Sequence, residues 1–299
     1  MTKGGVLLCF GYGYSAAALA RRLRAGPEGA NWRILGTTRK PEKAAGMRAE
    51  GVEPLLEAGD VERALAEADH LLISAGPSAG GGPEVDPTLA AHGAAIAAAA
   101  ERIAWVGYLS TTGVYGDHAG GWVDETAPRA PATDRGRLRV VAEDAWMALY
   151  RERGAPVHLF RLAGIYGPGR GPFEKVRQGT ARRIVKPGQV FSRIHVDDIA
   201  AVLEASIARP NPGAAYNVCD DDPAPPQDVI AHAADLLGLP APPEVPFEIA
   251  KAEMSPMAVS FYAESKRVSN RRIREELGVR LAYPDYRSGL AAVLAAEER

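Results

Sequence analysis

Short apolar runs alternate with helix-forming segments over the first third of the chain, and this alternation constrains the fold more than any other feature. The helix-forming segments are AAALARRL, PEKAAGMRAE and the alanine-rich stretches 61–68 and 88–102. The apolar runs between them are continuous, as is typical of strands that a parallel sheet buries on both faces. They read GVLLCF, WRILGTT, VEPLL, HLLISA and IAWVGYLS. The order predicts an α/β fold with a doubly wound parallel sheet.

The regular alternation ends after a sixth strand, and this predicts a second part of the chain. A helix over 137–150 has apolar residues at helical spacing, and the strand PVHLFRLAGIYG follows it. Beyond this strand, GPGRGP and the proline clusters at 223–226 and 240–246 interrupt the pattern. We therefore expect a Rossmann-type domain over 1–165 and a smaller C-terminal substrate lobe over 166–299.

Composition excludes several classes of protein. The chain has 35 basic and 37 acidic side chains, and its net charge of −2 gives no overall signature of nucleic-acid binding. Cys9 and Cys219 are far apart, without the spacing of a disulfide framework or a metal site. The apolar core of the N-terminus is too short for a signal peptide, and no run reaches the ~18 apolar residues that span a bilayer. We expect a cytoplasmic protein with no metal, membrane or nucleic-acid partner.

A glycine-rich turn joins the first strand to the first helix. Gly11, Gly13 and Ala16 form the pattern GxGxxA. Gly11 allows a tight turn, the missing side chain at Gly13 lets a pyrophosphate approach, and Ala16 permits close packing of the helix. The N–H groups at the helix start, where Tyr14 and Ser15 lie, would face the phosphates. A purely structural turn is the alternative, but the position at the start of a βαβ series favours dinucleotide binding.

The end of the second strand predicts which dinucleotide binds. An NAD site places an acidic residue there to hold the ribose 2′-OH, yet residues 31–40 contain no acid. The hydroxyl of Thr38 and the guanidinium of Arg39 suit a 2′-phosphate, so we expect NADP, with NAD as the alternative. Arg39 could also merely solvate the strand end, and Asp60 could contact the adenine or cap a helix. Two further candidates for cofactor contact follow the fourth strand, Ala75 and Gly76.

Four later motifs carry a resemblance to a known family. They are STTGVYGD at 110–117, RLAGIYGPGR at 161–170, RIHVDDIA at 193–200 and YNVCDDDP at 216–223. With the glycine turn, they make the chain resemble the extended short-chain dehydrogenases/reductases, and more closely the NAD-dependent epimerase/dehydratase family. The resemblance implies a cofactor across the switch point of a Rossmann domain, a return of about 193–220 to that domain, and hydride transfer at a carbon that bears a hydroxyl.

The family's catalytic Tyr and Lys are missing from their expected helix. By resemblance, the reaction needs a Ser or Thr that binds the substrate oxygen, a Tyr as general base and a Lys four residues later. Thr111 can supply the hydroxyl. Aligning RVVAE at 139–143 with the family places Arg135 at the Tyr position and Arg139 at the Lys position, where Arg139 could still hydrogen-bond the ribose. The alternative role of Arg139 is an ion pair with Glu143 on the helix surface.

Several residues are candidates for a substitute base, although each also has a structural alternative. Tyr115 is a candidate catalytic residue together with Thr111. In IHVDD, we expect Asp197 to cap the helix that follows. A literal YxxxK occurs at Tyr262 and Lys266, far from Thr111 in sequence, and we expect it not to be catalytic. The candidates for the base are Tyr115, Tyr166, Asp134 and His195.

The segment 161–193 is strongly basic, although the whole chain is nearly neutral. Eight basic residues against Glu174 alone give it a local charge of +7. By resemblance the segment lines the substrate cleft, so its charge predicts an anionic substrate such as a nucleotide-linked or phosphorylated sugar. A solvated helix face is the alternative, and the scarcity of interleaved aromatic residues disfavours nucleic-acid binding. The basic residues are Arg161, Arg170, Lys175, Arg177, Arg182, Arg183, Lys186 and Arg193.

Two functions of different classes fit the sequence. The first is an NADP-dependent oxidoreductase or epimerase that acts on an anionic small-molecule substrate, with Thr111 orienting the reacting oxygen. The second is a catalytically silent NADP(H)-binding sensor or scaffold protein, which the missing Tyr and Lys would favour. A homodimer is compatible with either function.

Overall fold

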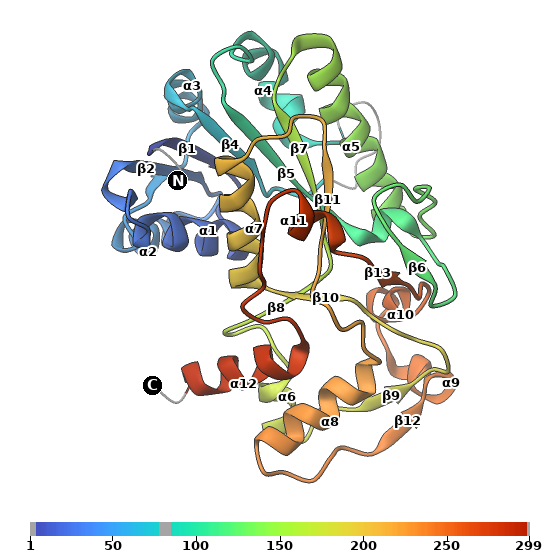
Figure 1. The fold of residues 1–299 in the computed structure, drawn as a ribbon. Coiled ribbons are helices and arrows are strands. Elements are labelled where there is room, and N and C mark those ends of the chain that lie inside the picture. Colours follow the sequence, from blue (N-terminus) through green and yellow to red (C-terminus); the bar gives the residue numbers. More distant parts are fainter. Residues whose placement is uncertain (1–3, 78–84, 298–299) are drawn as a thin grey trace.

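A seven-stranded parallel sheet forms the centre of the protein (Figure 1). The computed structural model describes residues 4–77 and 85–297. The strand order, β11-β7-β5-β4-β1-β2-β3, reverses between β1 and β4 and confirms the expected doubly wound α/β fold. The strands are β1 (Gly5–Phe10), β2 (Trp32–Thr37), β3 (Glu53–Leu55), β4 (His70–Ile73), β5 (Trp105–Thr111), β7 (Val157–Leu162) and β11 (Ala215–Val218).

Helices cover both faces of this sheet, as successive residues of β1 show. Leu7 and Cys9 belong to the core beneath α1 (Tyr14–Ala25) and α7 (Val196–Ala208). Leu8 and Phe10 point the other way, into a core that includes residues of the helices on the opposite face. Burial on both faces explains why most of these strands are continuous apolar runs in the sequence. The opposite helices are α3 (Ala58–Glu67), α4 (Pro87–Ala98) and α5 (Asp134–Arg153).

The expected sixth strand is two strands, and this corrects the prediction from sequence. The chain follows the main sheet as β7 and then leaves it at Ala163, so that β8 (Gly164–Tyr166) pairs with β10 (Arg193–His195) instead. The backbone N–H of Gly164 donates to the carbonyl of Ser192 on the segment before β10. The apolar character runs through the break because Ala163 and Tyr166 are buried and Ile165 is half-buried, so the sequence pattern does not mark it.

The second part of the chain packs around its own apolar core, below the main sheet in Figure 1. Three of its helices supply most of this core: α6 (Phe173–Arg177), α8 (Pro226–Leu236) and α12 (Tyr286–Glu297). Short strands pair outside the main sheet, β9 (Arg183–Val185) with β12 (Glu244–Pro246) and β6 (Trp122–Val123) with β13 (Arg267–Val268). The remaining α-helices in the described ranges are α2 (Ala44–Ala49), α9 (Phe247–Ala250), α10 (Pro256–Phe261) and α11 (Arg271–Glu275).

The start of α7 also corrects the sequence analysis. The capping side chain is His195, whose Nδ1 accepts from the backbone N–H of Asp197 at 3.2 Å, and Asp197 itself is exposed. The next residue, Asp198, is buried and accepts from the N–H groups of Ala282 and Tyr283. Asp198 therefore joins α7 to the segment before α12. Across 4–77 and 85–297, no helix has the length and apolar character needed to cross a membrane.

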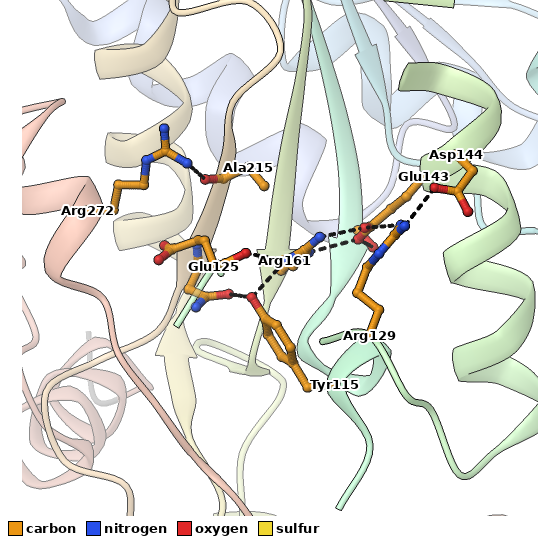
Figure 2. Close-up of polar contacts among 10 residues, drawn as sticks. Tyr115, Glu125, Arg129, Glu143, Asp144, Arg161, Ala215 and Arg272 are labelled. Atoms are coloured by element: carbon orange, nitrogen blue, oxygen red, sulfur yellow. Dashed lines mark hydrogen bonds and ion pairs between the residues drawn. The ribbon is translucent and has the colours of Figure 1, made fainter. Parts of the chain in front are cut away.

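A buried ion pair crosses the carboxyl edge of the main sheet (Figure 2). The guanidinium of Arg161, on β7, donates to both carboxylate oxygens of Glu143, on α5, at 3.1 and 2.9 Å. Neither side chain is more than 6% exposed. Ser110 donates to the same carboxylate at 2.6 Å, and Arg129 reaches it from the surface at 3.2 Å. Four hydrogen bonds thus offset the cost of burying this carboxylate.

The same network extends to the loop that follows β5. The Tyr115 hydroxyl accepts from Arg161 Nη1 at 2.8 Å and donates to Asn217 Oδ1 at 2.7 Å. The backbone N–H of Asn217 donates in turn to Glu125 Oε1 at 2.8 Å. These bonds join β7, β11 and the loop over a short distance, as Figure 2 shows. The network therefore fixes the residues on both sides of Thr111.

Replacing Glu143 by alanine would leave the Arg161 guanidinium buried without its carboxylate. We expect Glu143→Ala to lower the free energy of unfolding by about 3–5 kcal/mol, because an uncompensated buried charge is costly. Urea unfolding followed by circular dichroism measures this change. The control, Glu152→Ala, removes an exposed carboxylate from the same helix and should cost less than about 0.5 kcal/mol. Equal losses for the two variants would contradict the role given to the ion pair.

Candidate functional site

The glycine turn after β1 is held by the neighbouring strands. Gly11 has a φ of +85°, a conformation that favours glycine. Its N–H donates to the hydroxyl of Thr37, at the end of β2, at 2.7 Å. A Cβ at Gly11 would lie 3.0 Å from the backbone nitrogen of Ala75, beyond β4. The turn is therefore fixed from both sides at the switch point of the sheet.

The N-terminus of α1 has the properties of an anion-binding site. Gly13 occupies the capping position and provides no side-chain cap, and no acidic residue lies in the first turn. A Cβ at Gly13 would meet no atom within 4 Å, so a ligand could approach the backbone there. Tyr14 is half-buried and Ser15 is buried at the start of the helix. Unpaired N–H groups and the helix dipole would attract a phosphate at this position.

The strand end after β2 presents basic and hydroxyl groups. Thr38 is held by its N–H, which donates to the carbonyl of Leu55, and its hydroxyl accepts from the N–H of Lys40 at 3.2 Å. Arg39 is exposed and forms no ion pair with any residue in the described ranges. Asp60 lies inside the first turn of α3 and pairs with Arg63. Because Glu57 holds the capping position of α3, the alternative of Asp60 as a helix cap is wrong.

The carboxyl ends of β4 and β5 bring Gly76, Thr111 and Arg139 to one region. Arg139 Nη1 donates to the carbonyl of Leu109 at 2.6 Å and to the Tyr108 hydroxyl at 3.1 Å. A Cβ at Gly76 would lie 3.0 Å from Arg139 Nη2, so the guanidinium lies beside the loop after β4. The alternative ion pair of Arg139 with Glu143 is not formed, because Glu143 is buried against Arg161.

Thr111 ends β5 and caps the short 3-10 helix that follows. Its Oγ accepts from the N–H of Gly113 at 3.1 Å, which leaves the hydroxyl hydrogen available to donate to a ligand. Helix α5 packs against this loop, since a Cβ at Gly136 would lie 2.9 Å from the carbonyl oxygen of Gly113. Arg135 therefore lies on the first turn of α5 next to this loop, and its side chain is exposed.

The candidates for a substitute base are held in structural interactions. Tyr115 is fully buried between Arg161 and Asn217, and burial raises its pKa to about 12, which disfavours its candidacy as a base. Tyr166 is buried and bonds the carbonyl of Asp285, and burial raises its pKa as well. His195 caps α7 and is 2% exposed, and burial lowers its pKa. Asp134 is exposed and paired with Arg137.

The literal YxxxK has a structural role. Lys266 Nζ donates to the carbonyl of Gly116 and to Glu264 Oε2, both at 2.7 Å. The Tyr262 ring stacks on Phe247 with 4.9 Å between ring centroids. These contacts anchor the segment before β13 to the loop after β5, in line with the expectation that this pair is not catalytic.

Half of the eight basic residues in segment 161–193 form ion pairs with acidic residues elsewhere in the chain. Besides Arg161, three of its arginines pair with glutamates from the last sixty residues of the chain. Lys186 and Arg193 bind backbone carbonyls. Within the described ranges, Arg170 and Lys175 keep side chains without an acidic or carbonyl partner. The charge of +7 counted from sequence therefore overstates the free positive charge. The three pairs are Arg177–Glu297, Arg182–Glu253 and Arg183–Glu244.

Asp220 was not among the candidate residues from sequence, although it has an unusual environment. Asp220 is 1% exposed, and neither of its carboxylate oxygens has a hydrogen-bond partner within the described structure. Burial raises the pKa of Asp220 to about 8, although the nearby charge of Arg193 opposes this. The signal in the sequence was the last of the four motifs, YNVCDDDP, in which the first aspartate lies two residues after the end of the largely buried strand β11.

Two curated proteins are similar to this chain in sequence. Protein YeeZ of Escherichia coli strain K12 is 31% identical over 288 residues, which cover 92% of this chain and 95% of that protein. A 3-diazoavenalumate denitrifying reductase of a Streptomyces species is 29% identical over 180 residues, or 56% of this chain and 58% of that protein. No family model matches the chain.

Solved structures share the whole fold. A functionally unknown conserved protein from Silicibacter pomeroyi is 59% identical, with a TM-score of 0.89 over 99% of this chain and 100% of that one. The dTDP-glucose 4,6-dehydratase of Bacillus anthracis in complex with NAD is 16% identical, with a TM-score of 0.79 over 99% and 97%. The UDP-glucuronic acid 4-epimerase of Bacillus cereus in complex with NAD is 15% identical, with a TM-score of 0.77 over 98% and 100%. The last two are similar in fold.

The raised pKa of Asp220 makes stability depend on pH. The unfolded chain ionises this carboxyl near its ordinary pKa of 3.8, whereas the folded chain keeps it protonated to about pH 8. Stability contributed by this group is therefore lost as the pH rises from about 4 to 8. Asp220→Asn removes the ionisation, so its gain in unfolding free energy over the native chain should grow with pH and exceed about 2 kcal/mol at pH 8.

Urea unfolding at pH 5 and pH 8 measures this difference. Asp235→Asn, at an exposed position on α8, is the control and should change the unfolding free energy by less than about 0.5 kcal/mol at either pH. A gain of equal size at both pH values for Asp220→Asn would refute the assignment.

Proposed function

Because the chain belongs to the NAD-dependent epimerase/dehydratase family of extended short-chain dehydrogenases/reductases, we propose that it is an NADP-dependent oxidoreductase or epimerase that acts on an anionic small molecule. The observation that carries this proposal is the region where the ends of β1, β4 and β5 meet. There the open N-terminus of α1, the loop at Gly76 and the hydroxyl of Thr111 border one another along adjacent strands.

The residues present fit a nicotinamide dinucleotide. Gly13 leaves space for a pyrophosphate, and α1 offers uncapped N–H groups without an acid that would repel it. Arg139 lies beside Gly76, and its Nη2 has no hydrogen bond within the described residues, so it could hold a ribose hydroxyl. The dehydratase and the epimerase that share this fold are complexes with NAD, which supports the same class of cofactor here.

The groups after β2 favour NADP over NAD. Arg39 is exposed and unpaired within 4–77 and 85–297, and the Thr38 hydroxyl lies next to it in the chain. Asp60, the candidate for contact with the adenine, is engaged by Arg63. A guanidinium with a neighbouring hydroxyl matches the geometry and charge of a 2′-phosphate.

We propose reduction as the direction of the reaction. When bound, the nicotinamide would supply a hydride, and the substrate oxygen would then gain negative charge. Thr111 can donate a hydrogen bond to that oxygen, and Arg135 and Arg139 place permanent positive charges on the adjoining helix face. Water would supply the proton that completes the alcohol, because Tyr115, Tyr166 and His195 are buried in structural contacts. A relative named as a reductase supports this direction.

The charge near Thr111 supports an anionic substrate. Arg135 is exposed, has no ion pair in the described ranges, and lies 5.9 Å from the centroid of the exposed Phe261 ring on α10. A free guanidinium would bind a carboxylate or phosphate of a substrate, such as a nucleotide-linked or phosphorylated sugar.

A catalytically silent NADP(H) sensor or scaffold is the second candidate. The observation that favours it is the engagement of every candidate base, which leaves Arg135 and Arg139 where the family has its Tyr and Lys. A guanidinium remains protonated and cannot accept a proton. Turnover with any substrate would exclude this candidate.

Titration of the intact protein with NADPH and NADH, followed by nucleotide fluorescence, tests the cofactor proposal. NADPH should bind more tightly than NADH. Arg39→Ala should weaken NADPH binding about 10- to 100-fold and leave NADH binding nearly unchanged, because only NADPH loses a charge-assisted hydrogen bond. Arg48→Ala, at an exposed position on α2, is the control and should change neither affinity. Failure of the intact protein to bind either nucleotide would reject both candidate functions.

The role of Thr111 is tested on a substrate found by following NADPH consumption with phosphorylated and nucleotide-linked carbonyl compounds. Thr111→Val removes the hydroxyl while it keeps the shape of the side chain. We expect kcat/KM to fall about 100- to 1,000-fold, the effect of losing a hydrogen bond to a developing oxyanion. Thr112→Val, at the next position, should retain activity. Full activity of Thr111→Val would rule out the proposed role.

A further inference from the structure

A loop from the second part of the chain meets the glycine turn. The loop is YGPGR at 166–170, directly after β8. The hydroxyl of Tyr14, the first residue of α1, donates to the carbonyl of Pro168 at 2.9 Å. The contact joins residues 154 positions apart in sequence. It places the loop against the candidate pyrophosphate site.

The loop has a defined shape at this position. The backbones of Gly167 and Arg170 exchange two hydrogen bonds, at 3.1 and 2.9 Å, and close a tight turn. Gly167 has a φ of +152° and is buried, and a Cβ there would lie 2.5 Å from the Tyr14 hydroxyl. A larger residue at Gly167 would therefore push the loop away from α1. This close contact fixes the position of the Arg170 backbone.

The Arg170 side chain extends from this turn over α1. Its guanidinium carbon lies 5.8 Å from the centroid of the Tyr14 ring. Arg170 is exposed and has no ion pair within residues 4–77 and 85–297, unlike Arg177, Arg182 and Arg183 in the same basic segment. The charge of Asp197 raises the pKa of Tyr14, whereas the charge of Arg170 lowers it. Arg170 thus keeps a free cation beside the first residue of α1.

We propose that Arg170 binds the pyrophosphate of the dinucleotide from the side opposite the glycine turn. This inference rests on the proposed function, since it deepens the same cofactor site. The N–H groups of α1 carry partial charges only, whereas a pyrophosphate carries about two full negative charges, so a guanidinium complements them. The planar fork of arginine also matches two phosphate oxygens at once. Bound cofactor would then connect the Rossmann part to the second part of the chain through one side chain.

A structural role for Arg170 is the competing explanation, in which its contact with the Tyr14 ring only holds the loop in place. The two explanations predict that substitution of Arg170 changes the affinity for different sets of ligands. A tether would affect every ligand of the site or none, whereas a pyrophosphate contact affects only ligands that contain a pyrophosphate. Adenosine 2′-monophosphate lacks this group but retains the adenine, the ribose and the 2′-phosphate.

Calorimetric titration of the full chain with NADP+ and with adenosine 2′-monophosphate tests the proposal. We expect Arg170→Ala to weaken NADP+ binding about 10- to 100-fold and to leave binding of the monophosphate within about twofold. Arg170→Lys should recover part of the NADP+ affinity, because it keeps the charge but loses the fork. If the chain prefers NAD+, the same comparison is made with NAD+ and adenosine 5′-monophosphate capped as a methyl ester.

Arg177→Ala is the matched control. It removes an exposed arginine of the same segment, paired with Glu297, and should change neither affinity. Equal NADP+ affinity for Arg170→Ala and the native chain would overturn the proposal, and so would an equal loss for both ligands. A native chain that binds no dinucleotide would instead reject the proposed function on which this inference rests. Thermal unfolding of Arg170→Ala verifies that the exposed substitution leaves the fold intact.

Discussion

Arg161 brings a guanidinium into the interior at the carboxyl end of β7, and Glu143 meets it there from α5. Each charge would be costly in that place alone, so the pair, Ser110 and Tyr115 depend on one another. Because Ser110 and Tyr115 flank the loop after β5, the pair sets the position of Thr111. The geometry of the candidate site is thus determined by an interaction that no ligand would touch.

The candidate site is assembled from groups that parallel strands bring to one edge. The glycine turn, the loop at Gly76 and Thr111 follow β1, β4 and β5, which are neighbours in the sheet. The second part of the chain adds to this edge through the contact of Tyr14 with Pro168. Other contacts between the parts, such as those of Lys266 and Asp198, are buried and serve the fold. At this boundary, the residues of the candidate site therefore differ from the residues that stabilise the fold.

The main sheet and the glycine turn were predictable because both depend on local features. Burial on two faces makes strands continuous and apolar, and the close contact of Gly11 with Ala75 requires glycine. The break before β8 was not predictable, because apolar residues continue on both sides of it. The ion pairs formed by the arginines of the basic segment were not predictable either. The partners of Arg177, Arg182 and Arg183 lie 61 to 120 positions away in sequence, and only the fold brings them together.

Residue roles were less accessible to sequence than residue positions. Tyr115 occupies the place expected of a reactive hydroxyl, yet the burial that the sheet imposes raises its pKa beyond use as a base. His195 is buried as well, and its ring caps α7. Motif spacing identifies where such side chains lie along the chain. The solvent access that decides their chemistry depends on elements packed against them from elsewhere.

The hydrogen bond from Gly11 to Thr37 has a consequence for how such a protein could change its coenzyme. The turn that would receive the pyrophosphate is joined to the strand end that would distinguish the two ribose forms by this bond and by the bond from the Tyr12 N–H to the Thr37 carbonyl. Thr37 is therefore constrained by the turn, whereas residues 38–40 are free of it. Substitutions at those three positions can change the coenzyme preference while the glycine turn and Thr37 stay unchanged. Close relatives with this fold could therefore differ in coenzyme without any rearrangement of the sheet.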